Sequence, residues 1–547
     1  MSEGAVKKEE KARKFQAIKG TRDLLPPETG LWNRVEQTAH QVFATFGFGE
    51  IRLPIFEPTE LFARSIGAET DVVSKEMYTF QDFDISEELL HLWRLLFTSK
   101  DPSKYEEVMA LARLGGRVVH TVRAAFEDGQ VSRTPENLSA VDNIELYATK
   151  LPGIANQGTR ETSPVAAALR DAVTHLDFGD EVTLRPEATA STCRAYIEHN
   201  MQQLPQPVKL YTIGPMFRRE RPQKGRYRQF YQINAEVLEA TRKEVASGEW
   251  RVASKELEKD AAVDAEVIEM VMTFFERLEL PGVQLDINSI GHAADNCRRG
   301  YVAKLREKLQ EVKDQLGEDS RRRIETNPLR VLDSKLEHEQ PIIEKLPRIA
   351  DHLCEDCKAH YAAVKKELEL RGVQYQENWR LVRGLDYYMR TTFEITAKGL
   401  GSQNAVCGGG RYDGLVELLG GPPTKGIGFA IGEDRLILSL QESGKGAVAQ
   451  GRDVYIAWMG ENARATAVRA AKNLRSAGFS VELPPVEQKF GKALGQADKL
   501  GARYALILGD NEVASGEWTL KTLATGEQGK FTETQLLEFL RKGRSGE

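Results

Sequence analysis

The chain has 547 residues, of which 41% are hydrophobic and 29% charged, so it is long enough to form two to four globular domains. Its 81 acidic and 75 basic residues give a net charge of −6, so a nucleic-acid partner must be met by local basic patches. The N-terminus lacks a secretory signal, no apolar run approaches the roughly 20 residues of a membrane helix, and the five cysteines are few. We therefore expect a cytoplasmic protein without a membrane partner.

The N-terminal part is predicted to contain a charged tail, a helix and a strand. Residues 1–14 are rich in Lys and Glu and are expected to be disordered, with a basic arm that touches RNA as the alternative. Apolar residues recur at helical spacing over 30–46, which predicts a helix. The run 51–56 is typical of a strand, and Pro54 places that strand at an edge or bulge because proline has no N–H donor.

Residues 83–178 differ from their surroundings and are predicted to form a mostly helical insert. Ser86 and Ser103 are suitable N-caps for two helices, Ser163 before Pro164 predicts a third helix start, and looser segments are expected around 128–162. The insert carries 14 acidic and 10 basic residues, which argues against a large phosphate-binding face. A packing, dimer-supporting or protein-binding role is favoured.

Residues 207–239 are predicted to form two long strands joined by a basic loop. The connection 218–228 contains six basic residues and one acidic residue, Glu220, which indicates an anionic partner or a solvated basic turn. On the return strand, the period of two puts a cation, an aromatic ring, an amide and a carboxylate on one face, which suits a polar ligand better than a core: Arg228, Phe230, Gln232, Asn234 and Glu236. The opposite face is predicted to pack.

The remaining chain is predicted to alternate between helical and strand-rich regions. Residues 260–375 are charged and helical in character, 376–440 return to strands and glycines, and 441–451 have the composition of a linker. Beyond the linker, 452–547 are predicted to form a separate open α/β sheet. Its expected elements are strands at 454–458, 479–483 and 504–508 and helices at 463–477 and 492–500.

Two further blocks combine charge, aromatic rings and glycine. In 381–394, Arg383 and the pair Tyr387 and Tyr388 flank a glycine at the start of a predicted strand, where they could hold an anion and a flat polar ring. Neighbouring strand residues point in opposite directions, so only Tyr388 is assigned to a pocket. In 408–414, three glycines would allow backbone to approach a ligand closely.

These blocks resemble those of histidyl-tRNA synthetases, a family of class II aminoacyl-tRNA synthetases. The stretches 217–220 and 228–230, with Glu236, are similar to class II motif 2. The other similarities are 51–80 to the dimer-forming motif 1, 184–189 to the amino-acid loop, 381–394 and 408–414 to the two histidine-specific blocks, 426–435 to motif 3 and 452–547 to the anticodon-binding domain.

The resemblance implies an α+β catalytic core with a mixed, mainly antiparallel sheet, helical insertions and a C-terminal α/β anticodon-binding domain. The core would comprise residues 15–82, 179–259 and 376–440. It would be interrupted by the unusual insert at 83–178 and by a helical insertion domain at 260–375, which is expected to clasp the acceptor arm of tRNA. Other members of the family have a short turn in place of the insert at 83–178. A long insert at this position costs little free energy, because the entropy of loop closure grows only logarithmically with loop length.

The resemblance also implies how ATP is bound. Arg218 would bind the α-phosphate through its planar guanidinium, and Arg226 would approach the phosphates. Phe230 would stack on adenine, while Arg435 would cover it and reach the terminal phosphates. Arg383 would stabilise the charge that builds on the α-phosphate as pyrophosphate leaves, so Arg218 and Arg383 are the expected catalytic residues.

Six residues are expected to bind histidine by the same resemblance: Glu187, Thr189, Gln232, Glu236, Tyr388 and Tyr412. Glu187 and Gln232 would accept hydrogen bonds from the α-ammonium, with Thr189 framing that end. Glu236 and Tyr388 would pair the two imidazole nitrogens, which excludes amino acids without them. Tyr412 would line the pocket.

Arg221 and Gln223 are expected near the acceptor end of tRNA, and Mg²⁺ is expected with ATP, held by phosphates and Glu220. No dedicated protein metal site is predicted. Cys354 and Cys357, with His352 and His360 nearby, suggest zinc, but ligands at i, i+3 and i+6 spread around a helix and no second CxxC exists. An incidental helical pair is therefore preferred.

The predicted function is ATP-dependent activation of histidine to histidyl-adenylate and its transfer to the 3′ end of tRNA(His), by a homodimer. The alternative is a non-catalytic, synthetase-like regulatory subunit or a histidine- or tRNA-binding module. Such paralogues lose ATP or histidine residues or lack the last domain, whereas this chain keeps Arg218, Glu236, Arg383, Arg435 and 452–547. Another class II synthetase of the same subgroup is opposed by the blocks at 381–394 and 408–414.

Overall fold

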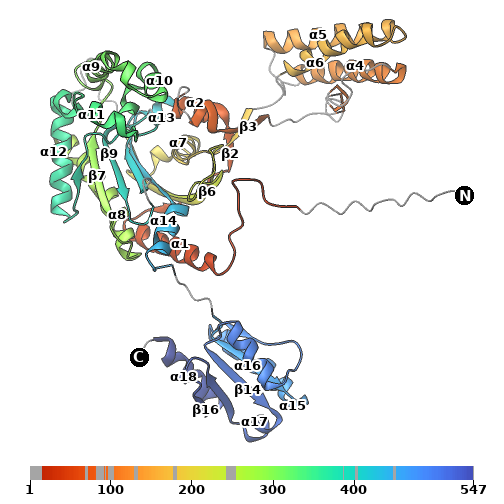
Figure 1. Cartoon of the computed structure of the whole chain (residues 1–547), viewed down its shortest axis with the longest axis vertical. Coiled ribbons are helices and arrows are strands. Elements are labelled where there is room, and N and C mark those ends of the chain that lie inside the picture. The colour runs from red at the N-terminus through yellow and green to blue at the C-terminus, as the bar shows by residue number, and fades with distance from the viewer. Residues whose placement is uncertain are drawn as a thin grey trace, which may run out of the picture. The chain divides into compact units, whose positions relative to one another are not determined.

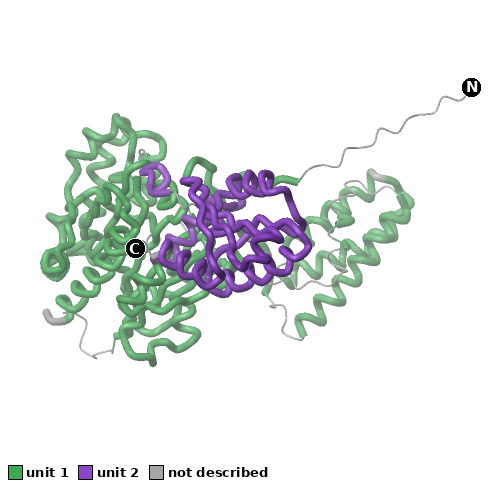
Figure 2. Tube along the Cα trace, turned by 90° about the horizontal axis from the view of Figure 1, so that it is seen from below, with its two compact units in different colours: residues 1–22, 39–439 green, residues 23–38, 440–547 purple. Residues whose placement is uncertain are grey.

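A computed structural model describes residues 15–67, 70, 72–81, 91–92, 94–96, 104–127, 134–176, 181–241, 254–385, 387–400, 404–446 and 451–545. The chain divides into two compact units, residues 1–22 with 39–439 and residues 23–38 with 440–547, which Figure 2 shows in green and purple. The tail at 1–14 and the predicted caps Ser86 and Ser103 lie outside the described residues. Within the described residues, no helix combines the length and apolarity needed to cross a membrane.

The first unit is built on an eight-stranded sheet (Figure 1). Its order is β1-β5-β6-β11-β10-β9-β7-β8, with parallel pairs only at β1–β5 and β7–β8, so the expected mixed, mainly antiparallel sheet is confirmed. The strands are β1 (Gly49–Glu50), β5 (Val208–Phe217), β6 (Gln229–Ala240), β7 (Gln284–Ser289), β8 (Gln376–Glu377), β9 (Met389–Thr396), β10 (Ala405–Arg411) and β11 (Thr424–Gly432).

The hairpin β5–β6 separates a polar face from a packing face, as its alternating sequence predicts. Ile233, Ala235 and Val237 are at most 2% exposed. They lie on the side covered by α1 (Glu28–Thr45) and α8 (Ser254–Arg277), where the Phe43 ring lies 5.8 Å from that of Phe274 and 6.0 Å from that of Phe429 in β11. The alternate residues of β6 are thereby directed to the opposite face, where the cavity described below is found.

A small sheet of order β2-β4-β3 precedes the main hairpin and corrects the predicted strand at 51–56. The strands are β2 (Phe56–Pro58), β3 (Tyr78–Gln81) and β4 (Glu181–Leu184), so residues 51–55 belong to no strand. Their carbonyls are bound instead by a buried side chain, because Arg185 donates from its Nη1 to the oxygens of Leu53 and Pro54 at 2.9 and 3.2 Å. Helix α2 (Thr59–Ile66) packs beside this sheet and against α7 (Thr189–Glu198).

The insert between β3 and β4 is helical and has its own core. It contains α4 (Tyr105–Glu127), α5 (Pro135–Ile154) and α6 (Thr159–Thr174), and its buried apolar cluster is drawn entirely from residues 92–176. The expected loose segment at 128–162 is wrong, since α5 fills most of it. The predicted helix start at Ser163 is also wrong, because α6 begins a turn earlier after Gly158 and tolerates Pro164 at the loss of one backbone hydrogen bond.

The second insertion lies between β7 and β8 and consists of helices and short 3₁₀ turns. Its helices are α9 (Arg298–Glu311), α10 (Glu318–Thr326), α11 (Gln340–Ile343) and α12 (Glu355–Leu370), and α12 returns to pack on α8 (Figure 1). The short helix α13 (Leu415–Leu418) and α14 (Glu433–Glu442) flank β11. Sequence periodicity identified this region as helical but missed β7, because the strand is a single short run between two helices.

The C-terminal part is an open α/β sheet of order β13-β12-β14-β15-β16. Strands β12 (Val454–Met459), β13 (Val481–Glu482) and β14 (Tyr504–Gly509) are mutually parallel around β12, and helices α15 (Glu461–Ser476) and α16 (Phe490–Lys499) follow the predicted alternation. The remaining elements, which the alternation did not reveal, are α17 (Asp510–Ser515), β15 (Trp518–Thr522), β16 (Gln528–Phe531) and α18 (Glu533–Ser545).

Candidate active site

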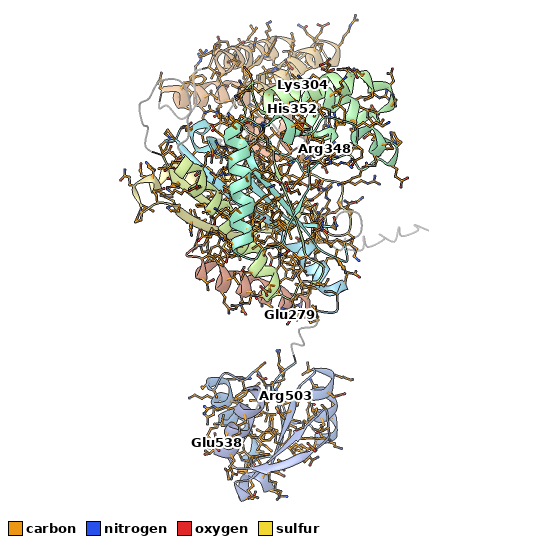
Figure 3. All side chains as sticks on the ribbon, turned by 90° about the vertical axis from the view of Figure 1, so that its left-hand side faces the viewer. Glu279, Lys304, Arg348, His352, Arg503 and Glu538 are labelled. Atoms are coloured by element: carbon orange, nitrogen blue, oxygen red, sulfur yellow. The ribbon has the colours of Figure 1, made fainter. Side chains whose placement is uncertain are left out.

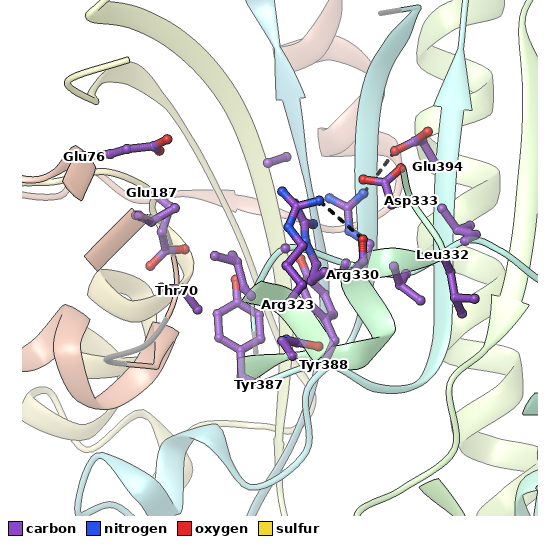
Figure 4. Close-up of a pocket in the computed structure, with 18 of the residues that line it drawn as sticks. Thr70, Glu76, Glu187, Arg323, Arg330, Leu332, Asp333, Tyr387, Tyr388 and Glu394 are labelled. Carbon is purple, nitrogen blue, oxygen red and sulfur yellow. Dashed lines mark hydrogen bonds and ion pairs between the residues drawn. The ribbon is translucent and has the colours of Figure 1, made fainter. Parts of the chain in front are cut away.

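A cavity of about 1010 Å³ opens on the polar face of the sheet. It is lined by β6, by the segment before β9 and by the second insertion (Figure 4). Figure 4 shows Glu187 on one side, Asp333 and Glu394 on the other, and the two tyrosines of 387–388 between them. A smaller cavity shares Arg218, Gln232 and Arg383 with the first, so the two form one continuous site with two compartments.

A buried carboxyl, Glu236, adjoins the larger compartment through Thr189, which lines it, whereas Glu236 and its other partner Tyr412 are not among the lining residues. It is 2% exposed and accepts hydrogen bonds from the hydroxyls of Thr189, at 2.6 Å, and Tyr412. Burial raises the pKa of Glu236 to about 8, the two hydrogen bonds oppose this rise, and the nearby Glu187 adds to it. Three residues predicted separately, from the loop, the hairpin and the glycine block, therefore form one hydrogen-bonded group.

Glycines in β11 leave the room that this group occupies. A Cβ on Gly428 would lie 1.7 Å from Glu236 Oε2, and a Cβ on Gly426 would lie 2.3 Å from the Tyr412 ring. In β10, a Cβ on Gly408 would lie 2.2 Å from the Arg383 guanidinium. The triple glycine belongs to β10, where it makes space for the protein's own side chains, and Gly408 also lines the smaller cavity, so its predicted approach to a ligand stays a prediction.

Glu187 has a structural task in addition to its expected one. Its carboxylate accepts the backbone N–H groups of Thr189 and Ala190, at 2.7 and 2.9 Å, at the start of α7. The carboxylate also lines the cavity, where its remaining lone pairs can accept an ammonium. Two polar atoms of β6 have no hydrogen-bond partner among the described residues, the acceptor Gln232 Oε1 and the donor Asn234 Nδ2. Unsatisfied buried groups beside a cavity suit a polar ligand.

The tyrosine pair corrects the strand predicted over 381–394. Strand β9 begins only at Met389, so Tyr387 and Tyr388 do not alternate across a sheet, and both line the cavity with ring centroids 4.7 Å apart. The Tyr387 ring also lies 5.7 Å from that of Tyr412. Tyr387 is therefore a pocket residue that strand periodicity excluded. Asn234 lay on the predicted polar face but had been given no role.

Arg383 lies where the two compartments meet. Its guanidinium is 3.4 Å from the Glu394 carboxylate and 5.6 Å from the centre of the Tyr388 ring. Glu394, on β9, faces both compartments and was not predicted as a site residue. Arg323 and Arg330, from the second insertion, also line the larger cavity. No local motif marks them, because they come from helices distant in sequence from the sheet.

The smaller compartment gathers the residues predicted to bind ATP. Arg218 donates from Nε to the Pro186 carbonyl at 3.0 Å and stacks over the Phe230 ring at 5.4 Å. Arg226 pairs with Glu220 at 3.0 Å, and Arg435 donates to the Ala405 carbonyl at 3.1 Å. These three arginines, together with Phe230 and Glu220, line the compartment. It therefore offers three guanidinium groups and an aromatic face to one ligand.

The basic loop between β5 and β6 is anchored at its base and exposed at its tip. Gln223 and Arg226 exchange backbone hydrogen bonds of 3.1 and 2.8 Å, and Arg221 and Gln223 are exposed. At the base, Arg228 N donates to Gly20 O at 2.7 Å, and Arg22 pairs with Asp434 at 3.2 Å. The sequence did not predict that the segment around Gly20 contacts this loop. The segment lies far from the loop in sequence and holds its base.

A buried ionic network supports the glycine block from behind. Arg411, 2% exposed, pairs with Asp264 of α8 at 2.6 Å and with Asp413 at 2.9 Å, and Asp264 also accepts from the Thr391 hydroxyl at 2.6 Å. Despite burial, the Arg411 and His360 partners lower the pKa of Asp264 to about 2. His360 lies 3.3 Å from Asp264, so it is not a partner of the cysteine pair with which it was weighed.

Comparisons with known proteins agree with this arrangement. Residues 159–436 match the family profile described as histidyl-tRNA synthetase, and residues 453–543 match an anticodon binding domain. Histidine–tRNA ligases of Solibacter usitatus and Koribacter versatilis are each 43% identical to this chain, over 95% and 96% of it and over 98% and 96% of their own lengths.

Among solved structures, the apo histidyl-tRNA synthetase of S. aureus matches with a TM-score of 0.63 at 30% sequence identity, over 97% of this chain and all of its own. The likeness thus extends over the catalytic core, the second insertion and the C-terminal sheet. The resemblance that the sequence blocks suggested is confirmed, and the chain belongs to the histidyl-tRNA synthetase family.

Proposed function

We propose that the chain activates histidine with ATP, forming histidyl-adenylate and pyrophosphate, and transfers the histidyl group to the 3′ end of tRNA(His). The observation that carries this proposal is the continuity of two compartments across Arg383. One compartment is lined by Thr189, which is hydrogen-bonded to the buried Glu236, and the other holds three guanidinium groups beside Phe230. An amino acid and a nucleotide bound in these places would meet at the guanidinium of Arg383.

The reaction needs alignment and charge neutralisation more than a protein nucleophile. The histidine carboxylate attacks the α-phosphorus, the bond to pyrophosphate breaks, and negative charge shifts to the leaving oxygens. Arg218 and Arg383 would bind the α-phosphate, and Arg226 and Arg435 the leaving phosphates, because guanidinium groups hold phosphate oxygens in pairs. Fixed cations cost no reorganisation at the moment of reaction.

Histidine selection would come from Glu236 and the tyrosines. Glu236 and Tyr388 would pair the two ring nitrogens, with Tyr412 and Thr189 holding the Glu236 carboxyl in place. Glu187, with Gln232 Oε1, would accept the ammonium. An amino acid without the imidazole would leave these buried groups unpaired, which a binding site penalises heavily.

Mg²⁺ would accompany ATP. Glu220 and Glu394 both face the nucleotide compartment, and carboxylate oxygens are ligands that Mg²⁺ prefers. They would hold the ion against the phosphates, whose charge it neutralises. Such oxygen ligands fit the ion's preference for a few carboxylates together with substrate phosphates.

The exposed Arg221 and Gln223 would contact the acceptor end of tRNA, and the C-terminal sheet would bind the anticodon. A homodimer formed through the motif 1 region, in the cytoplasm where tRNA is charged, completes the proposal. Sedimentation of the purified chain tests the dimer directly. A single species at the monomer mass, at micromolar concentration, would remove that part.

The decisive experiment is ATP–pyrophosphate exchange with each of the twenty amino acids. We expect exchange with histidine only, and a fall of 10²–10³-fold in kcat for Arg383→Ala, which is the typical cost of losing one charge-stabilising donor. Arg469→Ala, an exposed arginine on α15, is the matched control and should retain full exchange. Folded protein that shows no exchange with any amino acid would favour the regulatory alternative.

A further inference from the structure

Three thiols and an imidazole converge in the second insertion, outside the residues that line the active-site cavity. The ligand atoms of His292, Cys297, Cys354 and Cys357 all lie within 4.8 Å of one another. His292 Nδ1 is 3.2 Å from Cys357 Sγ and 3.7 Å from Cys354 Sγ. Cys297 and Cys357 are almost completely buried, at 1% and 0% exposure.

The separations match those of a tetrahedral metal site. Zinc binds sulfur at about 2.3 Å and imidazole nitrogen at about 2.0–2.1 Å, so neighbouring ligand atoms in a tetrahedron lie roughly 3.5–3.8 Å apart. The lower end of this range applies to a nitrogen–sulfur pair, and the two nitrogen–sulfur distances of 3.2 and 3.7 Å lie on either side of it. Three cysteines and one histidine are also a common ligand set of structural zinc sites.

The local backbone is arranged to bring these side chains together. His292 and Cys297 belong to a tight turn in which Arg298 N donates to His292 O at 3.1 Å and Cys297 N donates to Ala294 O at 3.0 Å. Gly291, at φ +63°, has room for no side chain, because a Cβ would lie 2.7 Å from Cys297 Sγ. The backbone at Gly291 therefore fixes the position of the Cys297 sulfur relative to the other three side chains.

Two helix N-termini also point at the cluster. Cys297 immediately precedes α9, Cys354 immediately precedes α12, and Cys357 lies in the first turn of α12. The positive end of a helix stabilises negative charge, so both positions favour the thiolate form that binds metal. A disulfide would use two of the three sulfurs and would leave the third, together with His292, without a purpose.

We propose that His292, Cys297, Cys354 and Cys357 bind one zinc ion that joins the start of the second insertion to its last helix. This set differs from the one weighed in the sequence. His352 packs its ring 5.6 Å from that of Tyr301 (Figure 3, where His352 is labelled), and His360 pairs with Asp264. The two further ligands, His292 and Cys297, lie 57–65 positions earlier in the sequence than the cysteine pair.

The site would also support the histidine pocket from outside. The turn that contains two of the ligands pairs with β9, since Ile290 N donates to Arg390 O and Arg390 N donates to Gly291 O, both at 2.8 Å. Arg298, next to Cys297, donates to the Tyr388 carbonyl. Cys297, Cys357 and Tyr388 share one buried cluster. Zinc would therefore fix the position of Tyr388 without touching substrate.

The test is the zinc content of the full-length protein, purified without added chelator and measured by mass spectrometry. We expect about one zinc ion per chain. Cys297→Ser and Cys354→Ser should each reduce zinc at least tenfold, while Cys193→Ala, a buried cysteine elsewhere, should retain it. Equal retention by all variants, or a folded wild-type chain that stays zinc-free after incubation with Zn²⁺, would overturn the proposal.

Co²⁺ provides a second readout that does not depend on the variants folding. Reconstitution of the wild-type chain with Co²⁺ should give the visible bands of a tetrahedral site and the near-ultraviolet bands of thiolate ligation, and adding Zn²⁺ should abolish both. Absence of these bands would count against the site. Removal of zinc should raise the KM for histidine more than the KM for ATP, which separates a support for Tyr388 from a general loss of folding.

Discussion

Glu236 should release a proton when histidine binds. With a pKa of about 8, its carboxyl is protonated in about nine of ten molecules at pH 7. Histidine brings a cationic ammonium into the compartment, and an opposite charge at close range lowers a carboxyl pKa by about 1–3 units. A fall to about 6 would leave about one carboxyl in ten protonated at pH 7, so binding should release about 0.8 proton from this group.

Isothermal titration calorimetry measures this release. Histidine is titrated into the protein at pH 7 in two buffers with different ionisation enthalpies, and the slope gives the number of protons. The imidazole of histidine titrates in the same range and adds its own contribution. Glu236→Gln removes the carboxyl and keeps the shape, so the difference between the wild-type and Glu236→Gln values isolates Glu236.

A matched change at Glu220, on the basic loop, should leave the proton count for histidine unchanged. Glu236 also makes the stability of the fold depend on pH. Because folding raises its pKa, the carboxyl stabilises the folded state at low pH, and this stabilisation is lost as the pH rises from about 4.5 to about 8. Equal proton release by the wild type and Glu236→Gln, with histidine bound in both, would refute the reasoning.

Further substitutions test the packing around the site. Gly408→Ala would put a Cβ 2.2 Å from the Arg383 guanidinium. We therefore expect kcat for pyrophosphate exchange to fall at least tenfold with little change in the KM for histidine. An unchanged kcat would contradict the idea that Gly408 makes room for Arg383. Gly428→Ala would put a Cβ 1.7 Å from Glu236 Oε2 and should instead raise the KM for histidine, and kinetics in which only the KM for ATP changes would argue against this placement. Asp264→Asn leaves the buried Arg411 without its carboxylate partner and should destabilise the first unit by about 3–5 kcal/mol, seen as a lower unfolding temperature in calorimetry; Asp171→Asn, an exposed carboxyl on α6, is the control and should not change it.

The parts of the fold that follow from local alternation could be predicted from the sequence. The hairpin β5–β6 places the buried polar residues Gln232, Asn234 and Glu236 on one face because its strands are long and regular and alternate between a polar and an apolar side. The strands and helices of the C-terminal sheet up to β14 follow the same logic. Motif resemblance then supplied the residues, such as Arg383, whose role depends on several elements at once.

What the sequence could not show depends on contacts between distant segments. Tyr387 lies in a turn before β9, so an argument from strand alternation assigned one tyrosine and excluded the other. The partners of Cys354 and Cys357 lie in a turn after β7, a strand that was itself missed. Arg323 and Arg330 reach the cavity only because the second insertion folds back over the sheet.

The pairing of β3 with β4 makes the first insert separable from the rest of the chain. Gln81 and Glu181 are direct neighbours across the ladder, although residues 82–180 lie between them in sequence. The insert brings its own apolar core and leaves through the same strand end by which it enters. A gene in which residues 82–180 are replaced by a tight turn should therefore encode an intact hairpin. The same position could receive a reporter or an affinity domain without altering β4, the strand that leads into the loop of Glu187 and Thr189.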